Sequence, residues 1–340
     1  MKSKVLSLFD IFYKEIDNSY YTRAFAAVYL FDYLDRLRIN NFPSDWFNIF
    51  EKEMKQIRNM HGFMKASLDL SLNKFDSFND EKPDDVEART GEMYYNLWKN
   101  FTKEEYFKQT AEYLKERFEK NGISVDGVGR ALDDGCGSGR YTLSLKALGC
   151  KNVTGIDVSP DSVALATKMN SFPEQKVKFM QGSVLELPFE NDAFDFVFSN
   201  GVLHHTLSTE KGLAEIYRVL KKGGRCWLYL YGGKDSLFWD IVDFCRKLLE
   251  NVPQNYTQTF MRVLGYPAGR IFHRTDFFYV PINRRYYTAE VEQMIKDSGF
   301  SKFERLKRGI AHDWDEVIYA NPHIDPYIYG EGEMRYLMRK

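Results

Sequence analysis

The sequence predicts an α/β fold with a doubly wound, mostly parallel seven-stranded sheet that has an antiparallel edge strand. The first reason is that short β-branched and aromatic segments alternate with segments of helical periodicity from residue 131 onwards. The second is a glycine-rich turn, residues 135–139, between the first strand and the first helix of that series. Such alternation favours parallel strands with helices on both faces. An N-terminal helical lobe and an insertion after the fifth strand complete the prediction.

Residues 1–90 are predicted to form the helical N-terminal lobe and a linker. Apolar residues recur at helical spacing over residues 1–74. The polar run 76–90 contains Pro83 and few large apolar residues, which is typical of a linker or loop. Residues 91–120 then have the pattern of one or two amphipathic helices that lead into the first strand.

Residues 91–321 are predicted to form the main domain. Its first five strands are expected at 131–134, 152–158, 177–183, 194–200 and 225–231, with helices after the first, second and fourth. Residues 234–287 interrupt this alternation and are expected to be an insertion that caps the substrate. A helix at 288–300 and strands at 303–309 and 316–321 should then close the sheet, which leaves 322–340 as a C-terminal tail.

Composition restricts the classes of partner and compartment. The chain has 340 residues, 44% of them hydrophobic, and its net charge of −1 gives no support for binding to nucleic acid. The four cysteines form no CxxC pair, which favours a reducing, cytoplasmic compartment. The first residues make a poor signal peptide, and no apolar run is long enough to span a bilayer. The sequence is compatible with a homodimer and does not decide between a homodimer and a monomer.

The glycine-rich turn predicts a place where a ligand touches the main chain. Gly135, Gly137 and Gly139 alternate with other residues at the carboxyl edge of the expected sheet, where open α/β folds bind ligands. A dinucleotide fingerprint would need glycine at the position of Arg140, and the Gly-Lys-Ser/Thr ending of a phosphate-binding loop is missing too. By itself the pattern is compatible with a simple tight turn.

Two acids near this turn indicate what the ligand is. Asp157 ends the next strand, where a carboxylate can accept hydrogen bonds from both hydroxyls of a ribose. Asp133 lies beside the glycine turn, where a carboxylate can balance a cationic group. The pair therefore favours a nucleoside that carries a positive charge.

Four segments follow one another along the chain, namely LDDGCGSGR, GIDVSPDSV, GSVLELPFENDAFDFVFSNGVLHHT and EIYRVLKKGGRCWLYLY. In order and spacing they resemble the motifs of class I S-adenosylmethionine-dependent methyltransferases, in particular the ubiquinone/menaquinone-type and small-molecule branch. The resemblance is close over about 131–231, loose over 288–321 and absent over 1–90. It implies a Rossmann-like fold, S-adenosylmethionine as cofactor, and methyl transfer to an oxygen, nitrogen or carbon atom of a small molecule.

The resemblance also implies which residues contact the cofactor. Asp133, Gly135, Gly137 and Gly139 would line the methionine moiety, and Asp157 would hold the ribose. Ser183 and Val184 would meet the adenine edge, and Asn200 would lie beneath the sulfonium. In many members a helix before the first strand closes over the cofactor, and here that helix would carry Tyr94, Tyr95 and Trp98. We assign Tyr95 to the cofactor and Tyr94 to the substrate, although both fit equally well as core residues.

Two residues depart from the family pattern. Members commonly have Asp where this chain has Ser183, and a serine makes a weaker bond to the adenine amino group. Asp134 occupies a position that is usually apolar. Its carboxylate would either face the substrate or cap the following turn, and we favour the cap.

His204 and His205 are the candidates for a catalytic base. They follow the fourth predicted strand, where the methyl group should emerge, and a hydroxyl or ammonium acceptor has to lose a proton. We expect His204 to be nearer the substrate and His205 to support it, and a structural histidine in a turn is an equally good interpretation of either.

The insertion interleaves arginines with aromatic residues, and we assign Arg284 and Tyr286 to the substrate, which would be anionic or aromatic. Ordinary surface arginines beside core aromatics are the alternative.

The six histidines have no ligand spacing, so no metal is expected. An RNA or protein methyltransferase and a non-catalytic cofactor-binding subunit stay as alternative functions. The Asn/Asp-Pro-Pro-aromatic motif of base-methylating enzymes is missing after the fourth strand.

Overall fold

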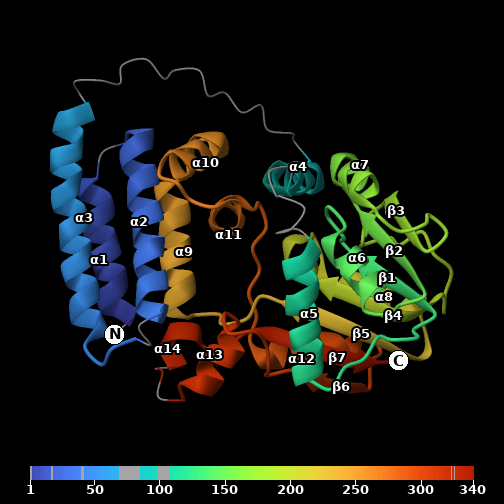
Figure 1. Ribbon diagram of the computed structural model, residues 1–340. Coiled ribbons are helices and arrows are strands. Elements are labelled where there is room, and N and C mark those ends of the chain that lie inside the picture. Colours follow the sequence, from blue (N-terminus) through green and yellow to red (C-terminus); the bar gives the residue numbers. More distant parts are fainter. Residues whose placement is uncertain are drawn as a thin grey trace. The chain divides into compact units, whose positions relative to one another are not determined.

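The computed structural model describes residues 2–16, 18–39, 42–68, 85–98, 107–322, 324 and 326–340. The chain divides into two compact units (Figure 1). The first comprises Met1–Lys82, Asp235–Tyr279 and Ile324–Gly330. The second comprises Pro83–Lys234, Val280–His323 and Glu331–Lys340.

The first unit is helical in its described residues. It contains α1 (Lys2–Glu15), α2 (Tyr20–Ile39), α3 (Trp46–Leu68), α9 (Leu237–Leu248), α10 (Gln254–Val263), α11 (Ala268–Tyr279) and α14 (Pro326–Tyr329). α9 packs along α2 (Figure 1). Arg274 of α11 is buried and forms ion pairs with Asp32 and Asp35 of α2. Most of the predicted insertion 234–287 therefore belongs to the same compact unit as the N-terminal helices, and its role as a substrate cap stays a prediction.

The second unit contains the seven-stranded sheet. Its strands are β1 (Arg130–Asp134), β2 (Asn152–Asp157), β3 (Val177–Gln181), β4 (Phe194–Asn200), β5 (Leu220–Leu230), β6 (Lys302–Arg305) and β7 (Met334–Arg339). Their order is β3-β2-β1-β4-β5-β7-β6. The first five strands pair in parallel, and β7 runs antiparallel to both β5 and β6. The predicted α/β fold, Rossmann-like and mostly parallel, is confirmed.

Helices cover both faces of this sheet. The described helices of this unit are α4 (Val86–Trp98), α5 (Gln109–Lys120), α6 (Arg140–Ala147), α7 (Pro160–Met169), α8 (Thr209–Val219), α12 (Thr288–Asp297) and α13 (Trp314–Ala320), with a 3-10 turn η2 (Leu203–His205). Successive strand residues point to opposite faces. Leu132 and Val197 therefore pack in a core with α8 and α12, whereas Ala131 and Phe196 pack in one with α5 and α6. Within the described residues, no helix is long and apolar enough to cross a membrane.

The predicted strand at 316–321 is wrong, because these residues lie in α13 and the coil after it. Asp313 is the N-cap residue of this helix, and Asp315 and Glu316 lie in its first turn, where carboxylates interact favourably with the helix dipole. The seventh strand is instead β7, in the part that we expected to be a C-terminal tail, 322–340. The tail prediction is thereby corrected.

The predicted linker also ends earlier than expected. Val86–Thr90 were assigned to the polar run 76–90, but they form the start of α4. The hydroxyl of Thr90 donates to the carbonyl of Val86 at 2.8 Å, so the polar side chain is satisfied inside the helix. Residues 76–84 lie outside the described part of the chain.

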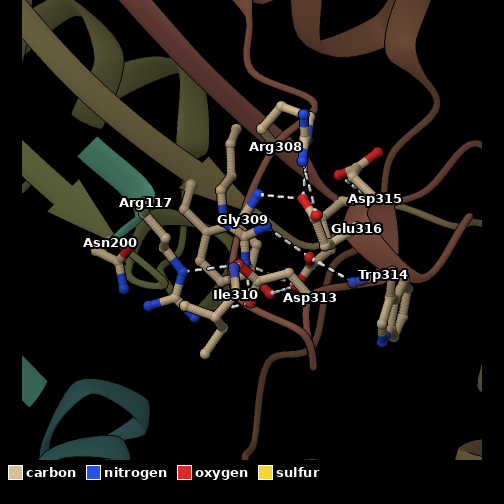
Figure 2. Close-up of polar contacts among 12 residues, drawn as sticks. Arg117, Asn200, Arg308, Gly309, Ile310, Asp313, Trp314, Asp315 and Glu316 are labelled. Carbon is tan, nitrogen blue, oxygen red and sulfur yellow. Dashed lines mark hydrogen bonds and ion pairs between the residues drawn. The ribbon is translucent and has the colours of Figure 1, made fainter. Parts of the chain in front are cut away.

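A buried ionic network attaches β7 to α5 and to the loop before α13, and Figure 2 shows its contact between Arg117 and Asp313. Arg117 of α5 donates to both carboxylate oxygens of Asp313, each at 2.8 Å. Asp313 also pairs with Arg335 of β7 at 3.1 Å, and the two side chains are 5% and 4% exposed. Arg335 pairs in turn with Glu333 at 2.6 Å. Although burial opposes it, Arg335 and Arg117 hold the pKa of Asp313 below its usual value.

We expect Asp313→Asn to lower the free energy of unfolding by about 3 kcal/mol, because two buried guanidinium groups would lose the charge that compensates them. Asp192→Asn is the matched control. Asp192 pairs with Lys340 at 2.9 Å and is 53% exposed, so its loss should cost under about 1 kcal/mol. Urea denaturation followed by circular dichroism measures both. Equal midpoints for the two variants would contradict a stabilising role of the network.

Candidate functional site

The turn between β1 and α6 presents a bare main chain at the carboxyl edge of the sheet. Its three glycines have positive φ values, +77° at Gly135, +51° at Gly137 and +85° at Gly139. A Cβ at Gly135 would lie 2.4 Å from a methyl group of Val202, so no side chain fits there. The Gly135 amide donates to the carbonyl of Ile156 at 3.0 Å, which fixes the turn against β2.

Asp157, the last residue of β2, supports this turn. One carboxylate oxygen accepts from the amide of Gly137 at 2.8 Å, and the other accepts from the amide of Ser159 at 3.0 Å. Burial raises the pKa of Asp157. Each oxygen has about two acceptor positions and uses one of them. The carboxylate can therefore still accept two hydroxyl groups, which is what a ribose presents.

Two other predicted cofactor contacts have partners within the protein. Asp133 is 2% exposed and accepts from the Thr142 hydroxyl at 2.6 Å. Burial raises the pKa of Asp133 to about 7. Asn200 ends β4, and its side-chain oxygen accepts from the indole of Trp227 at 3.0 Å. Contact of either residue with a cofactor stays a prediction.

Helix α4 lies against the ends of two strands through residues one turn apart. The Ser183 hydroxyl, just after β3, lies 3.5 Å from a carboxylate oxygen of Glu87. A Cβ at Gly91 would lie 2.8 Å from the Cβ of Ser159, so the helix approaches α7 closely at this glycine. The spacing of Glu87 and Gly91 puts both on one helical face.

The same face continues to Tyr94, which lies seven residues after Glu87. The centroid of the Tyr94 ring is 6.0 Å from that of the His205 ring. The face thus follows the carboxyl edge of the sheet from the end of β3 to the turn after β4. Tyr95 is half-buried beside it on α4. The Trp98 side chain lies outside the described residues.

Ser183 and Val184 follow β3, as the sequence led us to expect. The Ser183 hydroxyl accepts from the amide of Leu185 at 3.2 Å and so shapes the turn. Val184 is 7% exposed and packs in the core shared with α8. A main-chain contact of this turn with adenine stays a prediction.

His205 is held in one orientation by the main chain. Its Nδ1 lies 2.7 Å from the carbonyl oxygen of Ile282. A carbonyl can only accept, so Nδ1 carries the proton. In the neutral ring Nε2 then carries the lone pair, and this nitrogen is the one that can take up a proton.

His204 has a different environment from its neighbour. It is fully buried, and its ring centroid lies 3.8 Å from that of Tyr231 and 4.0 Å from that of His205. Burial, followed by the proximity of His205, holds the pKa of His204 well below its usual value. None of the described residues hydrogen-bonds to either of its ring nitrogens. His204 is therefore a neutral ring that takes up a proton poorly.

Arg284 and Tyr286, which we expected to bind the substrate, contact the polypeptide around η2. The guanidinium donates to the carbonyl oxygens of Thr206 and Leu207, the latter at 2.8 Å. The Tyr286 hydroxyl lies 2.8 Å from that of Thr209. Their contact with a substrate stays a prediction.

Asp134 does not cap the glycine turn, so that prediction is wrong. The N-cap residue of α6 is Gly139, and this cap has no side-chain hydrogen bond. Asp134 is fully buried, and Ser199 is the side chain that faces its carboxyl group, although it does not reach regular hydrogen-bond geometry. Burial raises its pKa to about 8. The reason is geometric, because Asp134 is the last residue of β1 and its side chain points to the face opposite that of Asp133.

Sequence comparisons identify the domain. A family profile described as a methyltransferase domain matches residues 132–228. The demethylmenaquinone methyltransferase of Staphylococcus aureus is 39% identical over 48% of this chain and 73% of its own length. An uncharacterised methyltransferase of Schizosaccharomyces pombe is 27% identical over 64% of this chain and 83% of its own length. The chloroplastic 2-methyl-6-phytyl-1,4-hydroquinone methyltransferase of Arabidopsis thaliana is 37% identical over 32% of each chain.

The sheet order, the glycine turn and the acid that ends β2 define a nucleoside-binding methyltransferase fold. The chain belongs to the class I S-adenosylmethionine-dependent methyltransferases, in the branch that contains quinone and small-molecule enzymes. S-adenosylmethionine is its cofactor. The site residues fit S-adenosylmethionine, because the Asp157 carboxylate retains acceptor positions for two ribose hydroxyls. It lies beside the glycine turn, where no side chain covers the main chain at Gly135.

Sequence reasoning missed Ile282, Tyr231 and Glu87. Ile282 acts through its carbonyl group, which no residue type reveals. Tyr231 was predicted only as the last residue of a strand, but it follows β5 and its ring packs at a tilt against that of His204. For Glu87 a signal existed, because it precedes Tyr94 by seven residues and so shares its helical face.

Proposed function

We propose that this protein transfers a methyl group from S-adenosylmethionine to a hydroxyl or amine of a small aromatic molecule, with His205 as the base. The observation that carries the proposal is the hydrogen bond between His205 Nδ1 and the Ile282 carbonyl at 2.7 Å. It assigns the lone pair to Nε2, at the end of the turn that follows β4. A base fixed in this way needs no reorganisation before it accepts a proton.

S-adenosylmethionine, when bound, supplies an activated methyl group for in-line displacement. The Asp157 carboxylate would accept the ribose hydroxyls, and the amides of the glycine turn would lie along the methionine part. Tyr94 lies beside His205 and would offer an aromatic face to a cationic group. Helix α4 would exclude water from the carboxyl edge, where it lies against Ser159 and Ser183.

The two histidines exchange the roles that the sequence favoured. The low pKa of His204 makes it a weak base, and its ring packs edge-on against His205 and tilted against Tyr231. We therefore assign the proton transfer to His205. His204 would pack against His205 as a neutral aromatic partner.

An aromatic acceptor is supported by the rings around His205, which are those of Tyr94, His204 and Tyr231. Two of the relatives are named for acting on demethylmenaquinone and on a hydroquinone. An anionic acceptor has less support, because the Arg284 guanidinium already donates to two carbonyl groups. A cytoplasmic location rests on four buried thiols without a disulfide.

The test is the variant His205→Gln, whose amide is polar and close to histidine in size but cannot act as a base. We expect kcat to fall by about 10²-fold while the Kd for S-adenosylhomocysteine stays unchanged. His312→Gln, at an exposed histidine, is the matched control. Activity is measured as transfer of a radiolabelled methyl group to a panel of hydroquinones and phenols.

The same labelled cofactor is offered to total RNA and to a protein extract. Label in RNA or protein alone would refute the small-molecule acceptor. A wild-type rate for His205→Gln would refute the base. Cofactor binding with no transfer to any fraction would identify a non-catalytic subunit.

A further inference from the structure

The segment from Ile282 to Tyr286 runs beside the turn that carries the histidine pair. The Ile282 carbonyl contacts His205 Nδ1 at 2.7 Å, and the Arg284 amide donates to the carbonyl of His204 at 3.1 Å. The Tyr286 amide donates to the carbonyl of Tyr231 at 3.0 Å. Alternate residues of the segment thus hydrogen-bond to the groups around the proposed base.

Arg284 also binds the far end of this turn. Its guanidinium donates to the carbonyl oxygens of Thr206 and Leu207, the latter at 2.8 Å. These carbonyls follow a 3-10 turn of three residues, too short to satisfy them within the turn. A planar guanidinium can bridge two neighbouring acceptors, which a single ammonium does less well.

A second anchor holds the start of the turn. The Thr209 hydroxyl lies 3.0 Å from the carbonyl of Leu203 and 2.8 Å from the Tyr286 hydroxyl. The turn is therefore held at both ends by the segment that also supplies the Ile282 carbonyl. If the Arg284 side chain were lost, the carbonyls of Thr206 and Leu207 would lose their donor, whereas the main-chain bond to His204 and the contacts of Thr209 would remain.

We propose that Arg284 is a positioning residue for His205. It fixes the turn so that Nδ1 stays hydrogen-bonded to Ile282 and Nε2 keeps the lone pair. The proposal rests on the proposed function, in which His205 is the base. It assigns Arg284 to the enzyme's own main chain and not to the substrate, as the sequence had suggested.

The first experiment compares Arg284→Met with Arg262→Met, a variant of an exposed arginine. For Arg284→Met we expect kcat to fall by about tenfold with the KM of the acceptor unchanged, because a small displacement of a base slows the reaction without weakening binding. Arg284→Lys should recover part of the rate. An increase in KM at constant kcat would show a substrate contact and overturn the proposal.

The second experiment reads the tautomer directly. In the ¹⁵N spectrum of histidine-labelled protein we expect one His205 nitrogen protonated and the other not, with the Nδ1–H form predominant. Arg284→Met should yield a mixture of the two tautomers, and a spectrum like that of wild type would overturn the proposal. If Arg284→Met does not fold, as judged by circular dichroism, Arg284→Lys is measured in its place against the same criteria.

The double variant separates this proposal from the proposed function. His205→Gln with Arg284→Met should be no slower than His205→Gln alone, because Arg284 acts through His205. Additive losses would overturn the positioning role and leave the base intact. A wild-type rate for His205→Gln alone would instead remove the base, whatever Arg284 does.

Discussion

Asp157→Ala is expected to weaken the binding of S-adenosylhomocysteine by about 10³-fold. The carboxylate has acceptor positions for two hydroxyl groups, and each hydrogen bond to a charged group contributes about 1.5–3 kcal/mol. The same substitution removes the acceptor for the Gly137 amide, which shapes the glycine turn. Loss of the ligand bonds and of the turn geometry should therefore act together.

Isothermal titration calorimetry measures this Kd directly. Asp161→Ala is the matched control, since Asp161 is an exposed acid four residues further on, in the first turn of α7. It removes the same charge without touching the turn, and we expect less than a threefold change. If Asp157→Ala and Asp161→Ala bound the ligand equally well, the assignment of the ribose to the end of β2 would be untenable.

The strands of the parallel half of the sheet could be predicted because each is a short apolar run between clear turn residues. The run 194–200 coincides with β4. The segment EVIYAN, residues 316–321, was wrongly predicted as a strand, because a short run of mixed polarity fits a strand or a helix equally well. The N-cap at Asp313 and the pairing of β7 decide the matter, and both depend on tertiary contacts.

The glycine turn and Asp157 could be predicted because their roles follow from residue type and from position after a strand. The orientation of His205 could not, because its partner is a main-chain carbonyl 77 residues away. The contacts of Arg284 were hidden for the same reason. Main-chain acceptors carry no residue signature, so sequence reasoning assigned this arginine to a substrate.

Asp134→Val is expected to stabilise the protein, most strongly at high pH. The folded state raises the pKa of Asp134 to about 8 from a usual value of 3.8, because the side chain is fully buried. Between about pH 4 and pH 8 the unfolded chain loses this proton and the folded chain keeps it. The free energy of unfolding therefore falls as the pH rises through that window, by about 1.4 kcal/mol for each pH unit.

Asp134→Val removes both the titration and the burial of a poorly hydrogen-bonded carboxyl group, and valine suits a β-strand. At pH 8 the variant should exceed wild type by about 6 kcal/mol, and at pH 5 by about 2 kcal/mol. Asp134→Asn is the informative companion, because its amide does not titrate but stays buried. Asp134→Asn should abolish the pH dependence that comes from Asp134. At pH 5 it should raise the free energy of unfolding by less than Asp134→Val does.

Urea denaturation of the three proteins at pH 5, 6, 7 and 8 gives the comparison. Asp133 also has a raised pKa, of about 7, and contributes its own slope to all three proteins. Subtracting the free energy of unfolding of wild type from that of Asp134→Val at each pH gives the contribution of Asp134, to the extent that the two acids titrate independently. If that difference were the same at every pH, Asp134 would not hold its proton in the folded state, and the buried carboxyl group would have to find compensation from another part of the fold.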